Sequence, residues 1–178
     1  MKLLLYSRHV FSGCVLLLSL LTLESCDSGS NGPRVLVFSE TRGYQHGSIP
    51  YGIAAIQKLG EEHGFAVDTT RNSEVFTDDN LKKYKAVVFN CTTGNVLNAK
   101  QQAAFERYIQ AGGGYVGIHS AADTEYDWPW YGKLMGAHFS SHPRNSNIQK
   151  ATVLVTDTTH ISTKGLPAKW DRTDEWYS

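Results

Sequence analysis

The stretch GGGYVGIHSAAD at residues 112–123 decides the fold of this chain. Three glycines end a helical pattern, a short and mostly apolar segment follows at residues 115–119, and polar side chains begin at His119. A short apolar run between turn residues is typical of a buried strand in a parallel sheet. Because the glycines precede a strand and not a helix, they predict a turn and not a phosphate-binding loop.

Strand patterns and helix patterns alternate along the rest of the chain. Strands are predicted at residues 34–39, 65–69, 86–90 and 115–119, and a fifth at residues 152–155. Helices are predicted at residues 50–64, 77–84 and 98–111, the last with Asn98 and Gln101 as a capping box. This alternation is typical of an α/β fold with a doubly wound, mostly parallel sheet that helices cover on both faces.

Polar side chains follow the predicted strands at the point where each strand ends. In open parallel sheets, ligands bind outside the carboxyl ends of the strands. These positions therefore predict a binding or catalytic site at one edge of the sheet. They are Ser39, Glu40, Tyr44 and His46 after the first strand, Cys91, Thr92 and Thr93 after the third, and His119, Ser120 and Asp123 after the fourth.

The first segment, residues 1–25, is typical of a bacterial export signal. Lys2 and Arg8 supply a positive start, and the nearly apolar run at residues 10–23 is short for a bilayer span. The sequence therefore predicts removal of this segment during export.

The end of the export signal, LESC at residues 23–26, resembles a lipoprotein cleavage box with Cys26 as the lipidated residue. Ordinary signal cleavage with Cys26 as a plain thiol is the alternative. Residues 26–33 predict a flexible tether, and residues 34–178 predict the folded domain. We therefore expect a protein of the bacterial cell envelope that is anchored to a membrane through Cys26.

Composition narrows the function classes further. The 17 basic and 17 acidic side chains give a formal net charge of zero, which argues against a nucleic-acid partner. Cys14 lies in the predicted signal and Cys26 in the predicted anchor, so Cys91 remains as a free thiol. We expect no internal disulfide, and we expect Cys91 to be a small buried core group at a strand end.

Several short motifs occur together in the predicted domain. They are GYQH at residues 43–46, GYVGIHSAAD at 114–123, WPWY at 128–131, GAHF at 136–139, HP at 142–143 and DEWY at 174–177. In this combination the chain, from about Arg34 to its end, resembles the ThuA-like (trehalose utilisation) family. The resemblance implies a flavodoxin-like, class I glutamine amidotransferase-like fold. Similar proteins usually continue past the DEWY motif, so the resemblance also implies that this chain is truncated at its C-terminus.

Amidotransferases of that fold place a catalytic cysteine on a tight turn between a strand and a helix. The corresponding position in this sequence is His119, and an imidazole cannot replace a thiolate in forming a stable acyl intermediate. The resemblance therefore implies the fold without glutaminase chemistry. Ser120 is a less favoured alternative nucleophile, because the turn position itself is the exposed one.

The strand-end rule makes His119 the first candidate catalytic residue, as a general base, a metal ligand or a hydrogen-bond donor. Asp123 is the second, because it could orient His119 or bind a ligand hydroxyl; its alternative role is a helix cap. His46 and the neighbouring Tyr44 are candidate substrate contacts in the first loop, where a histidine is often merely exposed.

His138 and His142 are candidate ligands for a divalent metal, since histidines four residues apart can share one side of a regular element. His119 and a carboxylate could complete that site through loop folding. The alternative is one structural histidine and one loop histidine before Pro143. Apart from this possible divalent metal, the sequence does not indicate a cofactor.

Aromatic and acidic residues suggest how a sugar could bind. Trp128, Trp130 and Tyr131 could stack on a sugar ring or fill the core at a helix start; the core is favoured for Trp130, and Trp128 is the candidate sugar contact. Glu175 is a candidate substrate contact that, with Asp174 and Asp123, could form an acid–base set.

The resemblance implies a role in utilising trehalose, a related disaccharide or an oxidised sugar, with a small-molecule carbohydrate as partner. The reaction would be that of a hydrolase or a lyase acting on a sugar derivative. Two alternatives stay open. One is a lipid-anchored protein that binds a sugar without turnover, and the other is an inactive fragment.

Overall fold

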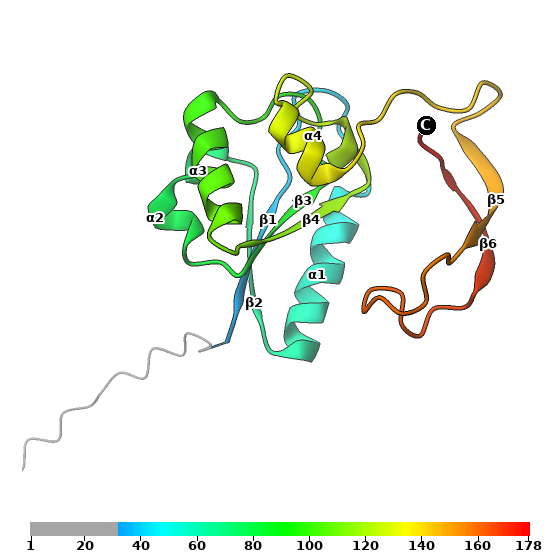
Figure 1. Cartoon of the computed structure of the whole chain (residues 1–178), viewed down its shortest axis with the longest axis horizontal. Helices are drawn as coiled ribbons and strands as arrows, with labels where there is room; N and C mark the ends of the chain where they lie inside the picture. The colour runs from blue at the N-terminus through cyan, green and yellow to red at the C-terminus, as the bar shows by residue number, and fades with distance from the viewer. Residues whose placement is uncertain (1–31) are drawn as a thin grey trace, which may run out of the picture.

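The computed structural model describes residues 32–178, so the predicted export signal and Cys26 lie outside the described residues. Four parallel strands form the main sheet in the order β2-β1-β3-β4 (Figure 1). Their bounds are β1 Arg34–Phe38, β2 Ala66–Thr70, β3 Ala86–Asn90 and β4 Gly114–Ile118. The four strands predicted from the apolar runs are confirmed. Within residues 32–178, no helix has the length and apolar character needed to span a bilayer.

Helices cover both faces of the sheet, which confirms the α/β fold. They are α1 Ile49–His63, α2 Asp78–Leu81, α3 Ala99–Gln110 and α4 Pro129–Met135, with short 3₁₀ turns η1 Ser73–Val75 and η2 His119–Asp123. Figure 1 shows α1 on the opposite side of the sheet from α2 and α3. The capping box at the start of α3 is confirmed, because Asn98 and Gln101 exchange side-chain and backbone hydrogen bonds.

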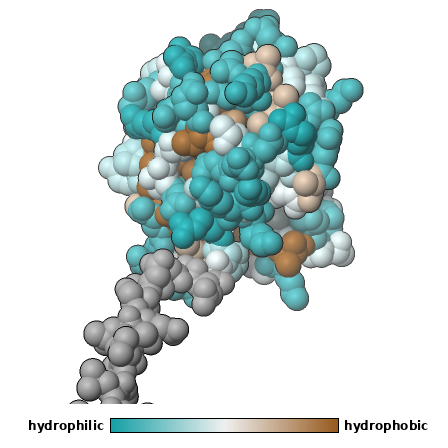
Figure 2. Space-filling view, turned by 90° about the vertical axis from the view of Figure 1, so that its left-hand side faces the viewer, coloured by the Kyte–Doolittle hydropathy of each residue, from teal (hydrophilic) through white to brown (hydrophobic). Residues whose placement is uncertain are grey.

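Alternation along the strands divides the core between the two faces. Leu36, Phe38, Val87 and Phe89 point into an aromatic cluster under α2, α3 and α4. Phe89 packs on Phe38 and Phe105 at ring-centroid distances of 5.2 and 5.4 Å. The surface outside this cluster, on the side of α2 and α3, is mostly hydrophilic (Figure 2). Burial of this cluster therefore fixes the position of the strands whose ends carry the candidate site.

The predicted fifth strand lies outside the main sheet, which corrects the expectation of one alternating sheet. β5 (Ile148–Leu154) pairs antiparallel with β6 (Lys169–Glu175) in a separate hairpin. Exposed and half-buried residues alternate along β5, which is typical of an antiparallel hairpin and not of a parallel strand buried on both faces. The hairpin lies beside the sheet in Figure 1, and its last residues return toward the carboxyl ends of the strands.

Glu125 joins the loop after η2 to the start of α3. Its side chain is fully buried. One carboxylate oxygen accepts hydrogen bonds from the backbone N–H groups of Val96 and Leu97, both at 2.7 Å, and the other accepts one from Gln102 Nε2 at 2.6 Å. Burial raises the pKa of this carboxyl above its ordinary value of 4.5, and the three hydrogen bonds oppose that rise.

We predict that Glu125→Ala lowers the free energy of unfolding by about 2–4 kcal/mol, because it leaves buried N–H donors without an acceptor. Glu125→Gln keeps an acceptor oxygen and should be milder. A raised carboxyl pKa means that the folded state binds the proton more tightly than the unfolded state, so the stability that comes from protonation of Glu125 is lost as pH rises from about 4.5 through the pKa of the folded state.

Chemical denaturation at pH 4.5 and pH 7 tests this prediction. Glu125→Gln should gain stability relative to the unsubstituted chain between the two pH values, since it removes the ionised carboxylate. A Glu62→Gln variant on the exposed face of α1 is the matched control. An equal pH dependence in all three chains would contradict the role given to Glu125.

Candidate functional site

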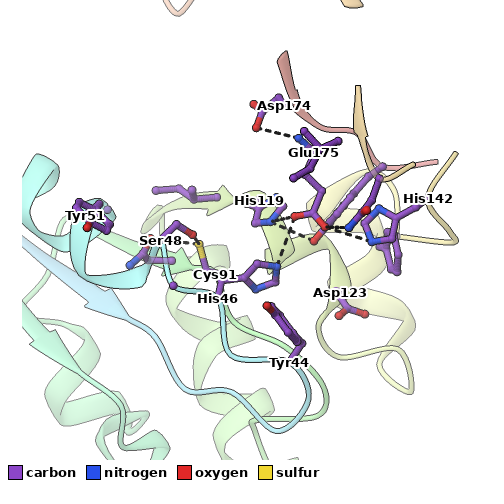
Figure 3. A pocket seen from close by; sticks show the side chains of 18 of the residues that line it. Tyr44, His46, Ser48, Tyr51, Cys91, His119, Asp123, His142, Asp174 and Glu175 are labelled. Atoms are coloured by element: carbon purple, nitrogen blue, oxygen red, sulfur yellow. Dashed lines mark hydrogen bonds and ion pairs between the residues drawn. The ribbon is translucent and has the colours of Figure 1, made fainter. Parts of the chain in front are cut away.

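A cavity of about 860 Å³ lies at the carboxyl ends of β1, β3 and β4 and is closed on one side by the β5–β6 hairpin. Figure 3 shows side chains from the sheet edge and from the hairpin pointing into this common space. The lining residues used below are Tyr44, His46, Tyr51, Cys91, His119, Asp123, His142, Glu175 and Tyr177. This cavity lies at the edge of the sheet where the strand-end rule predicted a site.

Glu175 is the carboxylate at the centre of the cavity. Its Oε2 atom lies 3.0 Å from His119 Nε2 and 3.9 Å from His46 Nε2. Its Oε1 atom lies 3.3 Å from His142 Nε2. The Tyr177 hydroxyl lies 3.3 Å from His119 Nε2. Three imidazoles, one carboxylate and one phenol thus form a single contact network, which we call the histidine cluster.

The end of β4 directs His119 into this cluster. The backbone turns from the extended strand directly into η2, and His119 takes a φ of 52° at the turn. Left-handed backbone is unfavourable for a residue with a Cβ and is enriched at functional sites. The elbow geometry expected at His119 is therefore present, and the side chain it presents is an imidazole.

The loop after β1 positions His46 against His119, with the two rings edge to face at a centroid distance of 4.5 Å. Its Nδ1 atom lies 3.2 Å from the hydroxyl of Ser120, which is fully buried. This contact fixes the ring and leaves Nε2 directed at Glu175. Ser120 therefore orients His46, and it does not line the cavity as an exposed nucleophile would.

Burial and charge set the protonation of the cluster. Burial lowers the pKa of His46 below its ordinary value of 6.5, and a positive charge on His119 would lower it further, while Glu175 opposes the shift. The pKa of the Tyr177 hydroxyl is raised above 10.0 by burial and then by the negative charges of Glu175 and Asp123. Near neutral pH the site thus contains a neutral His46 and a protonated phenol that can donate a hydrogen bond.

Asp123 lines the cavity without contacting His119. Its carboxylate accepts a hydrogen bond from the Tyr126 hydroxyl at 2.7 Å. The carboxylate that does contact His119 is Glu175, which the sequence identified as a substrate contact and as a possible member of an acid–base set. Tyr44 also lines the cavity, with its ring edge to face with His46 at 4.8 Å.

Two sequence candidates lie away from the histidine cluster. His138 stacks on Tyr126 at 4.8 Å, with its Nδ1 atom 3.4 Å from the Ala122 carbonyl oxygen, whereas His142 contacts Glu175. Trp128 stacks on Trp130 at 5.0 Å and packs against the aromatic core, so it is not a cavity residue.

Three aromatic residues of the cavity were not among the sequence candidates: Tyr51, Phe139 and Tyr177. Tyr177 follows Glu175 by two positions, and extended backbone places such side chains on the same side. That spacing within the DEWY motif could have identified it. Tyr51 lies in the first turn of α1 and is largely exposed, and no sequence pattern distinguishes it from an ordinary surface tyrosine.

Cys91 is buried at the end of β3, as expected, and has a φ of 54°. Its Sγ atom lies 3.5 Å from the Ser48 hydroxyl. Burial raises the pKa of the thiol above its ordinary value of 9.0, although the contact with Ser48 opposes this rise. Because the thiolate is the nucleophilic form, this environment lowers the reactivity of Cys91.

We predict that Cys91 reacts with iodoacetamide at pH 8 more slowly in the folded chain than after denaturation, because burial shields the thiol and raises its pKa, which lowers the fraction of thiolate. Mass spectrometry of the Cys91 peptide measures both rates. Equal rates would show an accessible and activated thiol and would reopen thiol chemistry at this site.

Solved structures of bacterial proteins share this fold. One, described as ThuA-like and from Bacteroides uniformis, is 27% identical and matches 83% of this chain and 62% of that chain with a TM-score of 0.70. Another, described as ThuA-like and from Parabacteroides merdae, is 20% identical and matches 82% of this chain and 63% of that chain with a TM-score of 0.63. The chain thus spans a little over three fifths of the length of these proteins. No curated protein matches it.

The family assignment rests on the match to a sequence model. The model of the ThuA family, described as trehalose utilisation, matches residues 34–178, which include every strand and helix of the described structure and all residues of the histidine cluster. The likeness to the solved ThuA-like proteins agrees with that match. The chain therefore belongs to the ThuA, or trehalose utilisation, family.

Proposed function

We propose that this domain acts on a sugar derivative that binds in the cavity beside the histidine cluster. The observation that carries the proposal is the 3.0 Å contact between His119 and Glu175 inside a cavity of about 860 Å³. Ligand cavities for small molecules have volumes of about 300–1,000 Å³. The cavity therefore has room for a disaccharide.

The lining of the cavity suits a carbohydrate. Sugars present apolar ring faces and many hydroxyl groups. Tyr44, Tyr51 and Tyr177 offer aromatic faces for the former, and the histidines and carboxylates offer hydrogen-bond partners for the latter. The printed description of the family, trehalose utilisation, favours a disaccharide or its oxidised derivative as the substrate class.

The contacts of the cluster support acid–base chemistry. Glu175 and His119 can accept a proton from a substrate C–H or O–H group and share it across their contact. The Tyr177 hydroxyl, which burial and nearby negative charge keep protonated, can donate to an oxygen of the substrate. A base and an acid that act on the same substrate can together catalyse proton removal next to a carbonyl, elimination or hydrolysis.

The expected location of the protein is the bacterial cell envelope. Residues 1–25 are typical of an export signal, and Cys26 fits a lipid anchor. A domain held at a membrane by the tether 26–33 would meet its sugar in the cell envelope. Mass spectrometry of the membrane fraction, with a lipid adduct on Cys26 as the supporting result, tests this part independently of catalysis.

We predict that His119→Ala and Tyr177→Phe each lower turnover of trehalose or a keto derivative of trehalose by at least about 100-fold, which is the usual contribution of one acid or base group. Carbon NMR of each sugar incubated with the full chain measures substrate loss and product formation. The matched control is His160→Ala, because His160 lies in the exposed loop between β5 and β6, away from the cavity.

Retained turnover in His119→Ala would contradict the proposed centre. Binding of the sugar by the unsubstituted chain without any product would instead favour the alternative of a sugar-binding protein. Circular dichroism of each variant identifies a loss that comes from misfolding.

A further inference from the structure

We infer that His46, His119 and Glu175 form a binding site for a divalent transition-metal ion, and that the ion fastens the β5–β6 hairpin to the parallel sheet. One ligand atom from each of these residues lies within 4.8 Å of the other two. They come from three separate segments: the loop after β1, the end of β4 and the end of β6. Figure 3 shows the three side chains converging in the cavity.

The separations between the ligand atoms are close to those of a real site. Metal–nitrogen and metal–oxygen bonds of about 2.1 Å give ligand-to-ligand distances of about 3.0–3.4 Å. The Oε2 atom of Glu175 lies 3.0 Å from His119 Nε2 and 3.9 Å from His46 Nε2. The second of these distances exceeds that range, so we expect a bound ion to draw His46 and Glu175 closer together.

The surroundings of the ligands orient them as metal sites require. Metal-binding histidines usually hold their second ring nitrogen in a hydrogen bond, which fixes the ring and its tautomer. The buried Ser120 hydroxyl does this for His46, through the 3.2 Å contact with Nδ1. His142 holds the other oxygen of Glu175 at 3.3 Å, so the carboxylate is also restrained from outside the trio.

The donor set favours one class of ion. Two imidazoles and one carboxylate suit zinc or iron(II), and three protein ligands leave a coordination position for water or substrate. Magnesium and calcium prefer oxygen ligands and would be bound poorly by two imidazoles. The open position would face the cavity, where an ion can polarise a sugar oxygen while Tyr177 remains beside it as a proton donor.

The ion would also join two parts of the structure. His46 and His119 belong to the sheet edge, whereas Glu175 ends β6 in a hairpin that pairs with no strand of the parallel sheet. Backbone hydrogen bonds between Ser178 and the segment at Ser140 and Ser141 also hold the hairpin end. Binding of the ion therefore stabilises the hairpin in its observed position, which no acid–base role of the same residues would do.

Titration calorimetry of the chelator-treated full chain with Zn²⁺ tests the inference. We expect one equivalent to bind, and we expect His46→Ala, His119→Ala and Glu175→Gln each to weaken the affinity by at least about tenfold, as even outer-shell partners of metal ligands do. His160→Ala and Glu62→Gln are matched controls that should bind as the unsubstituted chain does. Mg²⁺ should give no binding heat.

Hydrogen exchange supplies a second readout. Zn²⁺ should slow amide exchange in residues 169–177 of the unsubstituted chain and leave it unchanged in Glu175→Gln. Unaltered Zn²⁺ affinity in the three ligand variants, or equal loss in the controls, would overturn the inference. Loss in His138→Ala with retention in His46→Ala would also overturn it, and would favour the pair His138 and His142 instead.

The inference goes beyond the proposed function, because binding and exchange are measured without a sugar. Zn²⁺ binding through the trio in a chain that converts no sugar would support the ion and contradict the proposed enzyme. If the chain converts the sugar but its ligand variants bind Zn²⁺ normally, the proposed enzyme is supported and the metal site is contradicted.

Discussion

The parallel pairing of β1, β3 and β4 is the constraint on which the site depends. Because these strands run in the same direction and in register, the chain leaves all three at one edge of the sheet. His46 and His119, far apart in the sequence, consequently meet with their rings 4.5 Å apart. The aromatic cluster around Phe89 packs against one face of the sheet and stabilises the strands in that arrangement. The core thus determines where the reactive side chains lie, although none of its residues touches the cavity centre.

The sequence predicted the strands of the main sheet and those cavity residues that follow the strands. Apolar runs bounded by turn residues located the four parallel strands, and the strand-end rule identified His46, His119 and Asp123 as neighbours. The strand-end rule did not identify Glu175 as the partner of His119. Glu175 lies on β6, and the sequence of that strand, KWDRTDE, lacks an apolar pattern. Nor could the sequence place Trp128, since a stacking tryptophan and a core tryptophan have the same local sequence signal. No regular element connects His138 and His142, so their four-residue spacing does not by itself place them on one side of a helix or strand.

Two carboxylates illustrate how the environment divides structural from chemical roles. Glu125 is fully buried and is satisfied by two backbone N–H groups and one amide, which hold it in a single geometry. Glu175 is partly exposed and contacts three imidazoles that line the same cavity. The first carboxylate keeps a loop attached to α3. The second stands where a substrate or an ion can compete for its partners, which is why the proposals of function concern Glu175.

The left-handed backbone at His119 has an evolutionary consequence. Glycine adopts such a conformation without strain, whereas a residue with a side chain destabilises the folded state there by roughly 1–2 kcal/mol. A change to glycine would therefore tend to relieve the backbone while removing the imidazole from the cavity. Selection for stability and selection for a working site act in opposite directions at this position. In a chain that had no use for the imidazole, a change to glycine would remove this strain at no cost to function.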